Sequence, residues 1–149
     1  MDDRLQPSEY ERQRLANVHP PQWRNPVPPR KPYDLVVIGG GPAGLVSAES
    51  AIELDARVAV VERNALGGNC LNYGCVPSKS LIAAARRAHV MRTCAPFGIV
   101  PTNPTVSYKG IHDHIHGVIA AIAPNDSAER FTGLGVNVVR ATAQFISRD

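Results

Sequence analysis

The chain contains 149 residues, of which 44% are hydrophobic and 19% are charged, and its formal net charge is +3 at pH 7. This length allows one domain with a sizeable hydrophobic core. The basic residues are scattered among acidic ones and form no stripe with interleaved aromatic residues, which argues against a nucleic-acid-binding surface. No apolar stretch approaches the length of about 20 residues that crosses a bilayer, so we expect neither nucleic acid nor membrane as a partner.

Residues 1–32 are rich in proline and show no sustained apolar periodicity, which predicts a largely extended or disordered tail. Ser8 and Glu11 have the spacing of a capping box, so a short helix is expected to run to about Val18 and to end before Pro20-Pro21. The segment has neither a secretory signal nor the composition of a transit peptide. With an odd count of three cysteines, these features favour a cytoplasmic protein.

A strand, a glycine-rich turn, a helix and a second strand follow the tail. Tyr33–Ile38 is a short apolar run of strand character, and it leads directly into Gly39–Gly44, which contains the pattern G-x-G-x-x-G. A helical stretch covers Ala43–Leu54, and the β-branched segment Arg57–Glu62 ends in an acidic residue. This βαβ context is the one that a dinucleotide-binding motif requires. The sequence therefore predicts an α/β fold with a Rossmann-like parallel sheet.

Each glycine of the motif has a physical role. Gly39 makes the tight turn, Gly41 lets the backbone approach a pyrophosphate, and Gly44 lets the helix pack closely on the strand. The helix N-terminus, with Pro42 and Ala43, is expected to receive the phosphates. Glu62 is placed to accept hydrogen bonds from the ribose hydroxyls of an adenosine.

Two cysteines, Cys70 and Cys75, lie five residues apart on either side of a glycine-containing turn. In a regular helix their Cα atoms would be about 8.6 Å apart, which is beyond the roughly 7 Å that a disulfide can span. The segment must therefore bend, and Gly74 supplies the permissive backbone. Because Pro77 is tolerated in the first turn of a helix, Cys75 is expected at a helix N-terminus, where a thiolate is favoured.

This spacing indicates a redox pair, to which Lys79 would add positive charge. The alternatives are a structural disulfide, half of a zinc site, or two buried apolar cysteines. A zinc site needs about four ligands, and only His89 and Cys94 lie nearby. We therefore expect no metal site at these cysteines.

The residues after the cysteine segment predict a helix over Ser78–Arg92 that carries the redox segment into the core. Its buried face is expected to contain Leu81, Ile82, Ala85, Val90 and Met91. Cys94, just beyond this helix, is interpreted as a small apolar core residue.

Three histidines, His112, His114 and His116, form a further cluster. The apolar residues between Tyr108 and Ala123 recur at helical spacing, which makes His112 and His116 an i, i+4 pair. Such a pair can share a metal ion, but no third ligand is evident, and a solvated or partner-facing helix surface is favoured. After this helix, Gly135–Phe145 is expected to form one strand or two short joined strands.

The glycine motif, Glu62 and the segment GGNCLNYGCVPSK together resemble the pyridine nucleotide-disulphide oxidoreductases, the class that includes glutathione reductase, dihydrolipoyl dehydrogenase and mercuric reductase. The resemblance runs from about Lys31 to the C-terminus. It implies that the first dinucleotide fold binds FAD, that NAD(P)H donates electrons, and that a disulfide between Cys70 and Cys75 passes them to the substrate.

By this resemblance, Cys75 is the charge-transfer thiolate beside the flavin, Cys70 is the interchange thiol that meets the substrate, and Lys79 approaches the flavin ring. Asn69 stands where a threonine usually precedes the first cysteine. The implied cofactor-binding residues are Gly39, Gly41, Pro42, Ala43, Gly44, Glu62, Arg63, Gly68, Asn69, Cys75 and Lys79.

The resemblance also implies parts that these 149 residues lack, namely a nicotinamide domain and a dimerisation domain. We therefore interpret residues 33–149 as the N-terminal part of the FAD-binding domain of a larger, homodimeric flavoenzyme, inactive as a fragment. The segment Gly74–Lys79 looks most like mercuric reductases, so Hg(II) is the leading substrate. A dihydrolipoyl or other disulfide is the alternative, and a non-catalytic dinucleotide-binding module is a further one.

Overall fold

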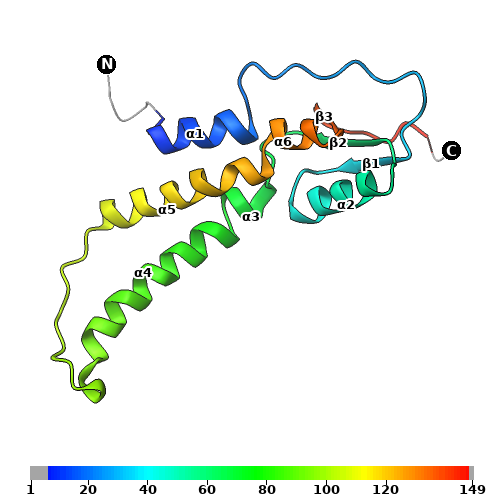
Figure 1. Cartoon of the computed structure of the whole chain (residues 1–149). Helices are drawn as coiled ribbons and strands as arrows, with labels where there is room; N and C mark the ends of the chain where they lie inside the picture. Colours follow the sequence, from blue (N-terminus) through cyan, green and yellow to red (C-terminus); the bar gives the residue numbers. More distant parts are fainter. Residues whose placement is uncertain (1–6, 148–149) are drawn as a thin grey trace, which may run out of the picture.

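The structure is a computed structural model that describes residues 7–147 (Figure 1). The elements occur in the order α1 (Glu9–Val18), β1 (Leu35–Ile38), α2 (Pro42–Glu53), β2 (Val58–Glu62), α3 (Gly68–Asn72), α4 (Cys75–Thr93), η2 (Ala95–Phe97), α5 (Tyr108–Ile122), η3 (Ala123–Asp126), α6 (Ala128–Gly133) and β3 (Asn137–Arg140). Within these residues no helix is both long enough and apolar enough to span a membrane.

The three strands form one parallel sheet in the order β1-β2-β3. The register aligns Val37 with Val60 and Val60 with Val138. Since parallel neighbours need long crossover connections, α2 joins β1 to β2 and the segment from α3 to α6 joins β2 to β3. The predicted α/β fold and its βαβ unit are confirmed.

The core lies between the helices and one face of this sheet. Leu45 and Ala48 of α2 and Phe131 of α6 are almost fully buried in one cluster with Val60 and Val138. The other face of β1 is open among the described residues, because Val36 and Ile38 are 50% and 57% exposed. The alternation along β1 therefore separates a packed face from an uncovered one.

Helices α4 and α5 run antiparallel and extend away from the sheet (Figure 1). α4 starts at Cys75 rather than at Ser78, with Pro77 in its first turn. The predicted buried face of this helix is wrong. All five of the residues expected there are exposed, namely Leu81, Ile82, Ala85, Val90 and Met91. α4 packs against α5 and α3, and Ser80 is the one buried residue of the described helix, so the covered side of α4 is not the side that carries these apolar residues.

Other elements agree with the expectations from sequence. α5 includes the three histidines, Cys94 is buried after α4, and a single strand, β3, forms within the predicted C-terminal stretch. The short N-terminal helix is also confirmed, since Ser8 caps α1 by accepting a hydrogen bond from the amide of Glu11.

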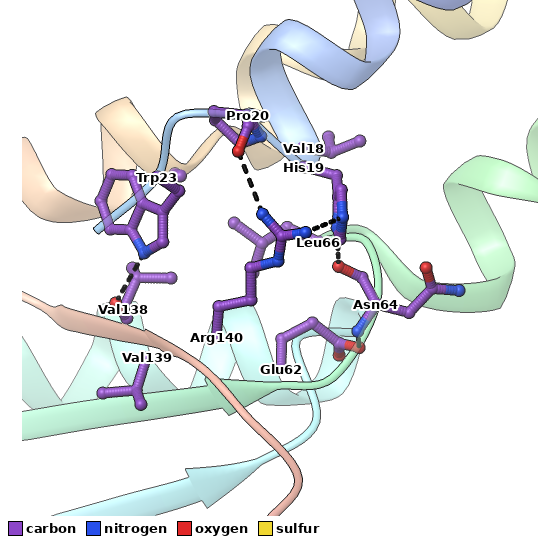
Figure 2. A pocket seen from close by; sticks show the side chains of 11 residues that line it. Val18, His19, Pro20, Trp23, Glu62, Asn64, Leu66, Val138, Val139 and Arg140 are labelled. Atoms are coloured by element: carbon purple, nitrogen blue, oxygen red, sulfur yellow. Dashed lines mark hydrogen bonds between the residues drawn. The ribbon is translucent and has the colours of Figure 1, made fainter. Parts of the chain in front are cut away.

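The segment after α1 is irregular but closely bound to the sheet. The indole of Trp23 donates to the carbonyl of Val138 at 3.3 Å, and Arg140 donates to the carbonyl of Pro20 and to the ring of His19, as Figure 2 shows. Asn25 bonds both backbone groups of Arg140 through its side chain. These contacts satisfy the outer edge of β3, which would otherwise present unpaired backbone groups.

Candidate functional site

The glycine loop and both cysteines line one groove at the carboxyl end of β1. Its lining residues are Ile38, Gly39, Gly41, Pro42, Ala43, Gly44, Asn69, Cys70 and Cys75. The carboxyl edge of a parallel sheet is where ligands bind in open α/β folds. The fold thus brings together two motifs that are separated in the sequence.

Glycine is required in this groove because backbones pass very close to one another. A Cβ atom on Gly44 would lie 2.1 Å from the carbonyl oxygen of Gly39, and one on Gly68 would lie 2.8 Å from the Cα of Gly41. Gly39 and Gly68 also have positive φ angles of 105° and 55°, which favour glycine. No side chain caps the N-terminus of α2, so its first amides are available to an anion. This side-chain-free cradle fits a pyrophosphate.

Glu62, the last residue of β2, is held firmly at the same edge. Its Oε2 accepts a hydrogen bond from the amide of Gly40 at 2.6 Å, and its Oε1 accepts one from the amide of Asn64 at 2.7 Å. A carboxylate has about four acceptor positions, so Glu62 can still accept hydrogen bonds from a ligand. This arrangement fits the predicted contact with ribose hydroxyls.

A second hollow adjoins the first at Ile38 and Gly39. It is lined by Ile38, Gly39, Val61, Glu62, Arg63, Ala141, Thr142 and Ala143. Glu62 and Arg63 were predicted from the sequence, whereas residues 141–143 were not. The signal that identifies them is the sheet register, since Glu62 pairs with Arg140 and the chain therefore leaves β3 beside Glu62.

The two cysteines lie on either side of the break between α3 and α4. Cys70 is in α3 and half-buried, whereas Cys75 is the first residue of α4 and exposed; both are free thiols. A hydrogen bond with the Cys75 thiol raises the pKa of Cys70, burial adds to this effect, and the charge of Lys79 opposes it. The predicted bend thus places the sulfurs in hydrogen-bonding reach, with exposed Lys79 close by.

The turn between the cysteines is built on Asn69 and Asn72. The carbonyl of Asn69 accepts hydrogen bonds from the amides of Tyr73 and Gly74, at 2.9 and 2.6 Å. A Cβ atom on Gly74 would lie 3.1 Å from the carbonyl oxygen of Asn69, so the backbone leaves little room for a side chain there. Asn72 is buried and donates to the carbonyls of Leu66 and Gly68. The structural role of Asn72 was not recognised from the sequence.

The histidine cluster lies on α5, away from the residues that line the groove. The rings of His112 and His116 are 4.3 Å apart, as expected for an i, i+4 pair. Burial, followed by repulsion from His112, lowers the pKa of His116. Residues 7–147 contain no group of three or more His, Cys, Asp or Glu side chains that could hold a metal ion.

Comparison with known proteins gives consistent matches. A family model described as "Pyridine nucleotide-disulphide oxidoreductase" matches residues 33–147. Dihydrolipoyl dehydrogenase 2 of Haloarcula marismortui is 39% identical over 113 residues, covering 76% of this chain and 24% of the relative. Mercuric reductase of Serratia marcescens is 46% identical over 78 residues, covering 51% of this chain and 17% of the relative.

A solved structure supports the fold. It is the Cu(II) complex of the HOCl-induced flavoprotein disulfide reductase RclA from Escherichia coli, with a TM-score of 0.59 and 23% sequence identity over 75% of this chain and 22% of that chain. The chain thus spans about a quarter of the length of the curated relatives that match most of it.

Proposed function

Because the chain belongs to the pyridine nucleotide-disulphide oxidoreductase family, whose members use FAD and NAD(P)H, we propose that it forms the flavin-binding and disulfide-bearing part of an NAD(P)H-dependent oxidoreductase. The observation that carries the proposal is the shared groove, in which Cys70 and Cys75 lie beside the glycine loop. The complete enzyme is proposed to be a homodimer.

In this proposal the pyrophosphate of FAD is held by the glycine loop and by the N-terminus of α2. The loop contributes the backbone around Gly39, Gly41 and Gly44, and the helix begins with Pro42 and Ala43. Glu62 holds the adenosine ribose. The remaining contacts with FAD are proposed to come from Arg63, Gly68, Asn69 and Lys79. When bound, FAD supplies a two-electron carrier that accepts hydride from NAD(P)H.

The chemistry that the chain itself supplies is dithiol oxidation. The reduced pair transfers two electrons as the sulfurs of Cys70 and Cys75 join, with release of two protons, while a substrate disulfide is cleaved to two thiols. We assign Cys70 as the thiol that exchanges with the substrate and Cys75 as the thiol beside the cofactor. The hydrogen bond with Cys75 that raises the pKa of Cys70 requires adjacent sulfurs. It therefore supports the proposal that these two cysteines form a disulfide.

Two substrate classes are proposed. A small disulfide of the lipoyl type is the first, because the relatives named dihydrolipoyl dehydrogenase include matches over three quarters of this chain. Hg(II), reduced by two electrons to the metal, is the second, and it rests on the match to a mercuric reductase that is 46% identical over 51% of this chain. Turnover of lipoamide and of Hg(II) by the full-length protein, with NADH and with NADPH, distinguishes these classes.

The assignment of the cysteines is tested in the full-length protein with three serine variants. We expect Cys75→Ser to abolish long-wavelength charge-transfer absorbance with flavin still bound, and Cys70→Ser to retain that absorbance. Cys94→Ser is the control, since Cys94 is buried after α4, and it should leave the spectrum unchanged. If Cys70→Ser and Cys75→Ser both leave the flavin spectrum unaltered, the assignment of the two cysteines fails. A wild-type protein that binds flavin without any NAD(P)H-dependent turnover would be a non-catalytic dinucleotide-binding module instead.

A further inference from the structure

An arginine from the N-terminal helix contacts the turn that separates the two cysteines. Nη1 of Arg14, in α1, donates a hydrogen bond of 2.6 Å to Oδ1 of Asn72, which lies 58 positions further along the chain. The Arg14 side chain is only 13% exposed, and Asn72 is only 7% exposed. A charged donor to a buried amide makes a hydrogen bond stronger than a neutral one.

The Asn72 amide has three hydrogen-bond partners. Its nitrogen donates to the carbonyl of Leu66 at 3.1 Å and to that of Gly68 at 2.8 Å, while its oxygen accepts from Arg14. Asn72 ends α3, two residues after Cys70 and three before Cys75. The amide therefore fixes the short helix that carries Cys70 at the point where the chain turns towards Cys75.

Arg14 is itself held in place by the docking of α1. Glu11, on the same helix, is 3.5 Å from its guanidinium. At the end of α1, Val18 is buried in the core, and its carbonyl accepts a hydrogen bond of 2.9 Å from the amide of Leu66. The next residue, His19, bonds the carbonyl of Asn64 (Figure 2). The helix thus contacts the segment between β2 and α3 at several points.

We propose that Arg14 is a positioning residue for the cysteine pair, and that α1, through the Arg14–Asn72 hydrogen bond, favours the disulfide between Cys70 and Cys75. The inference rests on the proposed function, in which these cysteines form a redox disulfide. α1 lies outside residues 33–147, which match the family. The contact from Arg14 therefore comes from a segment that the family match does not include.

The direction of the effect follows from preorganisation. Oxidation by glutathione disulfide joins the two sulfurs, and the oxidant is reduced to two glutathione thiols, so atoms and electrons balance. A rigid turn keeps the two sulfurs within hydrogen-bonding reach of each other, and this favours ring closure. Without Arg14, the buried carbonyl of Asn72 loses its charged donor and the turn loosens. We expect the equilibrium to shift about fivefold towards the dithiol, which corresponds to about 20 mV.

The first test compares Arg14→Met with Arg12→Met in the full-length protein. Arg12 lies on the same helix but is exposed, and its side chain bonds only the carbonyl of Pro7 among the described residues, so this variant is a matched control. The disulfide fraction is measured by acid trapping and mass spectrometry across a series of glutathione redox buffers. We expect about a fivefold shift for Arg14→Met and none for Arg12→Met. Equal behaviour of the two variants overturns the proposal.

The second test separates this inference from the proposed function. In the reduced protein, alkylation of Cys70 by iodoacetamide should be severalfold faster in Arg14→Met than in Arg12→Met, with buried Cys94 unchanged. If the wild-type protein forms no disulfide in any buffer, the proposed function fails, and an unchanged alkylation rate of Cys70 refutes the role of Arg14 independently. If Cys94 also reacts faster, the whole chain has opened, and the milder Arg14→Gln is judged by the same two measurements.

Discussion

The two motif glycines at the start of α2, Gly41 and Gly44, have different surroundings. A Cβ atom on Gly44 would lie 2.1 Å from the carbonyl oxygen of Gly39 and 2.9 Å from the Cγ1 atom of Val37. A Cβ atom on Gly41 would meet nothing closer than the Cα of Gly68 at 4.0 Å. One glycine is therefore needed by the fold itself, whereas the other leaves space beside the groove.

Replacing Gly44 with alanine should destabilise the protein whether or not flavin is present. The added methyl group would meet the backbone of Gly39, so α2 must move away from β1, and we expect the free energy of unfolding to fall by about 3 kcal/mol. Urea denaturation of the flavin-free protein measures this change. Gly133→Ala is the control, because nothing lies within 4 Å of the added atom. Equal losses in the two variants would contradict the steric argument.

Replacing Gly41 with alanine should instead weaken flavin binding and leave the fold intact. Its φ and ψ angles of −79° and 179° are accessible to any residue, so stability should stay within about 0.5 kcal/mol of wild type. The methyl group would stand where the pyrophosphate is proposed to approach the backbone, and we expect the Kd for FAD to rise at least about tenfold. Quenching of flavin fluorescence reports this Kd. An unchanged Kd would show that the phosphates bind elsewhere.

At the scale of elements, β1 and β2 are joined where they begin by an ion pair. Asp34 accepts hydrogen bonds from the backbone amide, Nε and Nη2 of Arg57, at 2.8, 2.8 and 2.7 Å. The pKa of Asp34 lies well below its usual range, mainly because of the side-chain hydrogen bonds from Arg57. Both residues immediately precede their strands, so the pair helps to set the register of Leu35 opposite Val58.

The stabilisation from Asp34 should depend on pH in a defined direction. Its pKa is lower in the folded chain than the value of about 3.9 for an unfolded aspartate, so the stabilisation is present above about pH 4 and is lost as the pH falls through the folded pKa. We expect Asp34→Asn to lower the urea midpoint at pH 7, and the difference from wild type to shrink below pH 4. Glu53→Gln, at an exposed carboxylate, is the control. A difference that grows on acidification would contradict the argument.

Local sequence signals predicted some of the elements. Contacts between distant segments could not be predicted in this way. β1, α2 and β2 follow from β-branched runs around a glycine turn, and the bend at Gly74 follows from the spacing of the cysteines. The exposed face of α4 was not foreseen, because its apolar residues cannot show which side α5 covers. The contact between Arg14 and Asn72 joins residues 58 positions apart. The spacing of apolar residues along the sequence cannot predict such a contact.

At the scale of the whole molecule, the N-terminal segment is part of the folded body. Trp23 and Asn25 bond the outer edge of β3, Arg14 bonds the cysteine turn, and Val18 belongs to the same core cluster as the strands. Residues that precede the dinucleotide fold thus contact both the cysteine turn and the part of β3 that pairs with Glu62. The stability of the site and the docking of this segment should therefore change together.

This coupling can be tested with one core substitution in the N-terminal segment. Val18 is 2% exposed, so Val18→Ala leaves a cavity beside the sheet, and we expect the free energy of unfolding of the flavin-free protein to fall by about 2 kcal/mol. Val27, in the same segment, is 89% exposed, and Val27→Ala should change stability by less than about 0.5 kcal/mol. Urea denaturation followed by circular dichroism measures both, and a single transition is expected in each case. If Val18→Ala leaves the main transition unchanged, the segment does not contribute to the core, and α1 unfolds independently of the sheet.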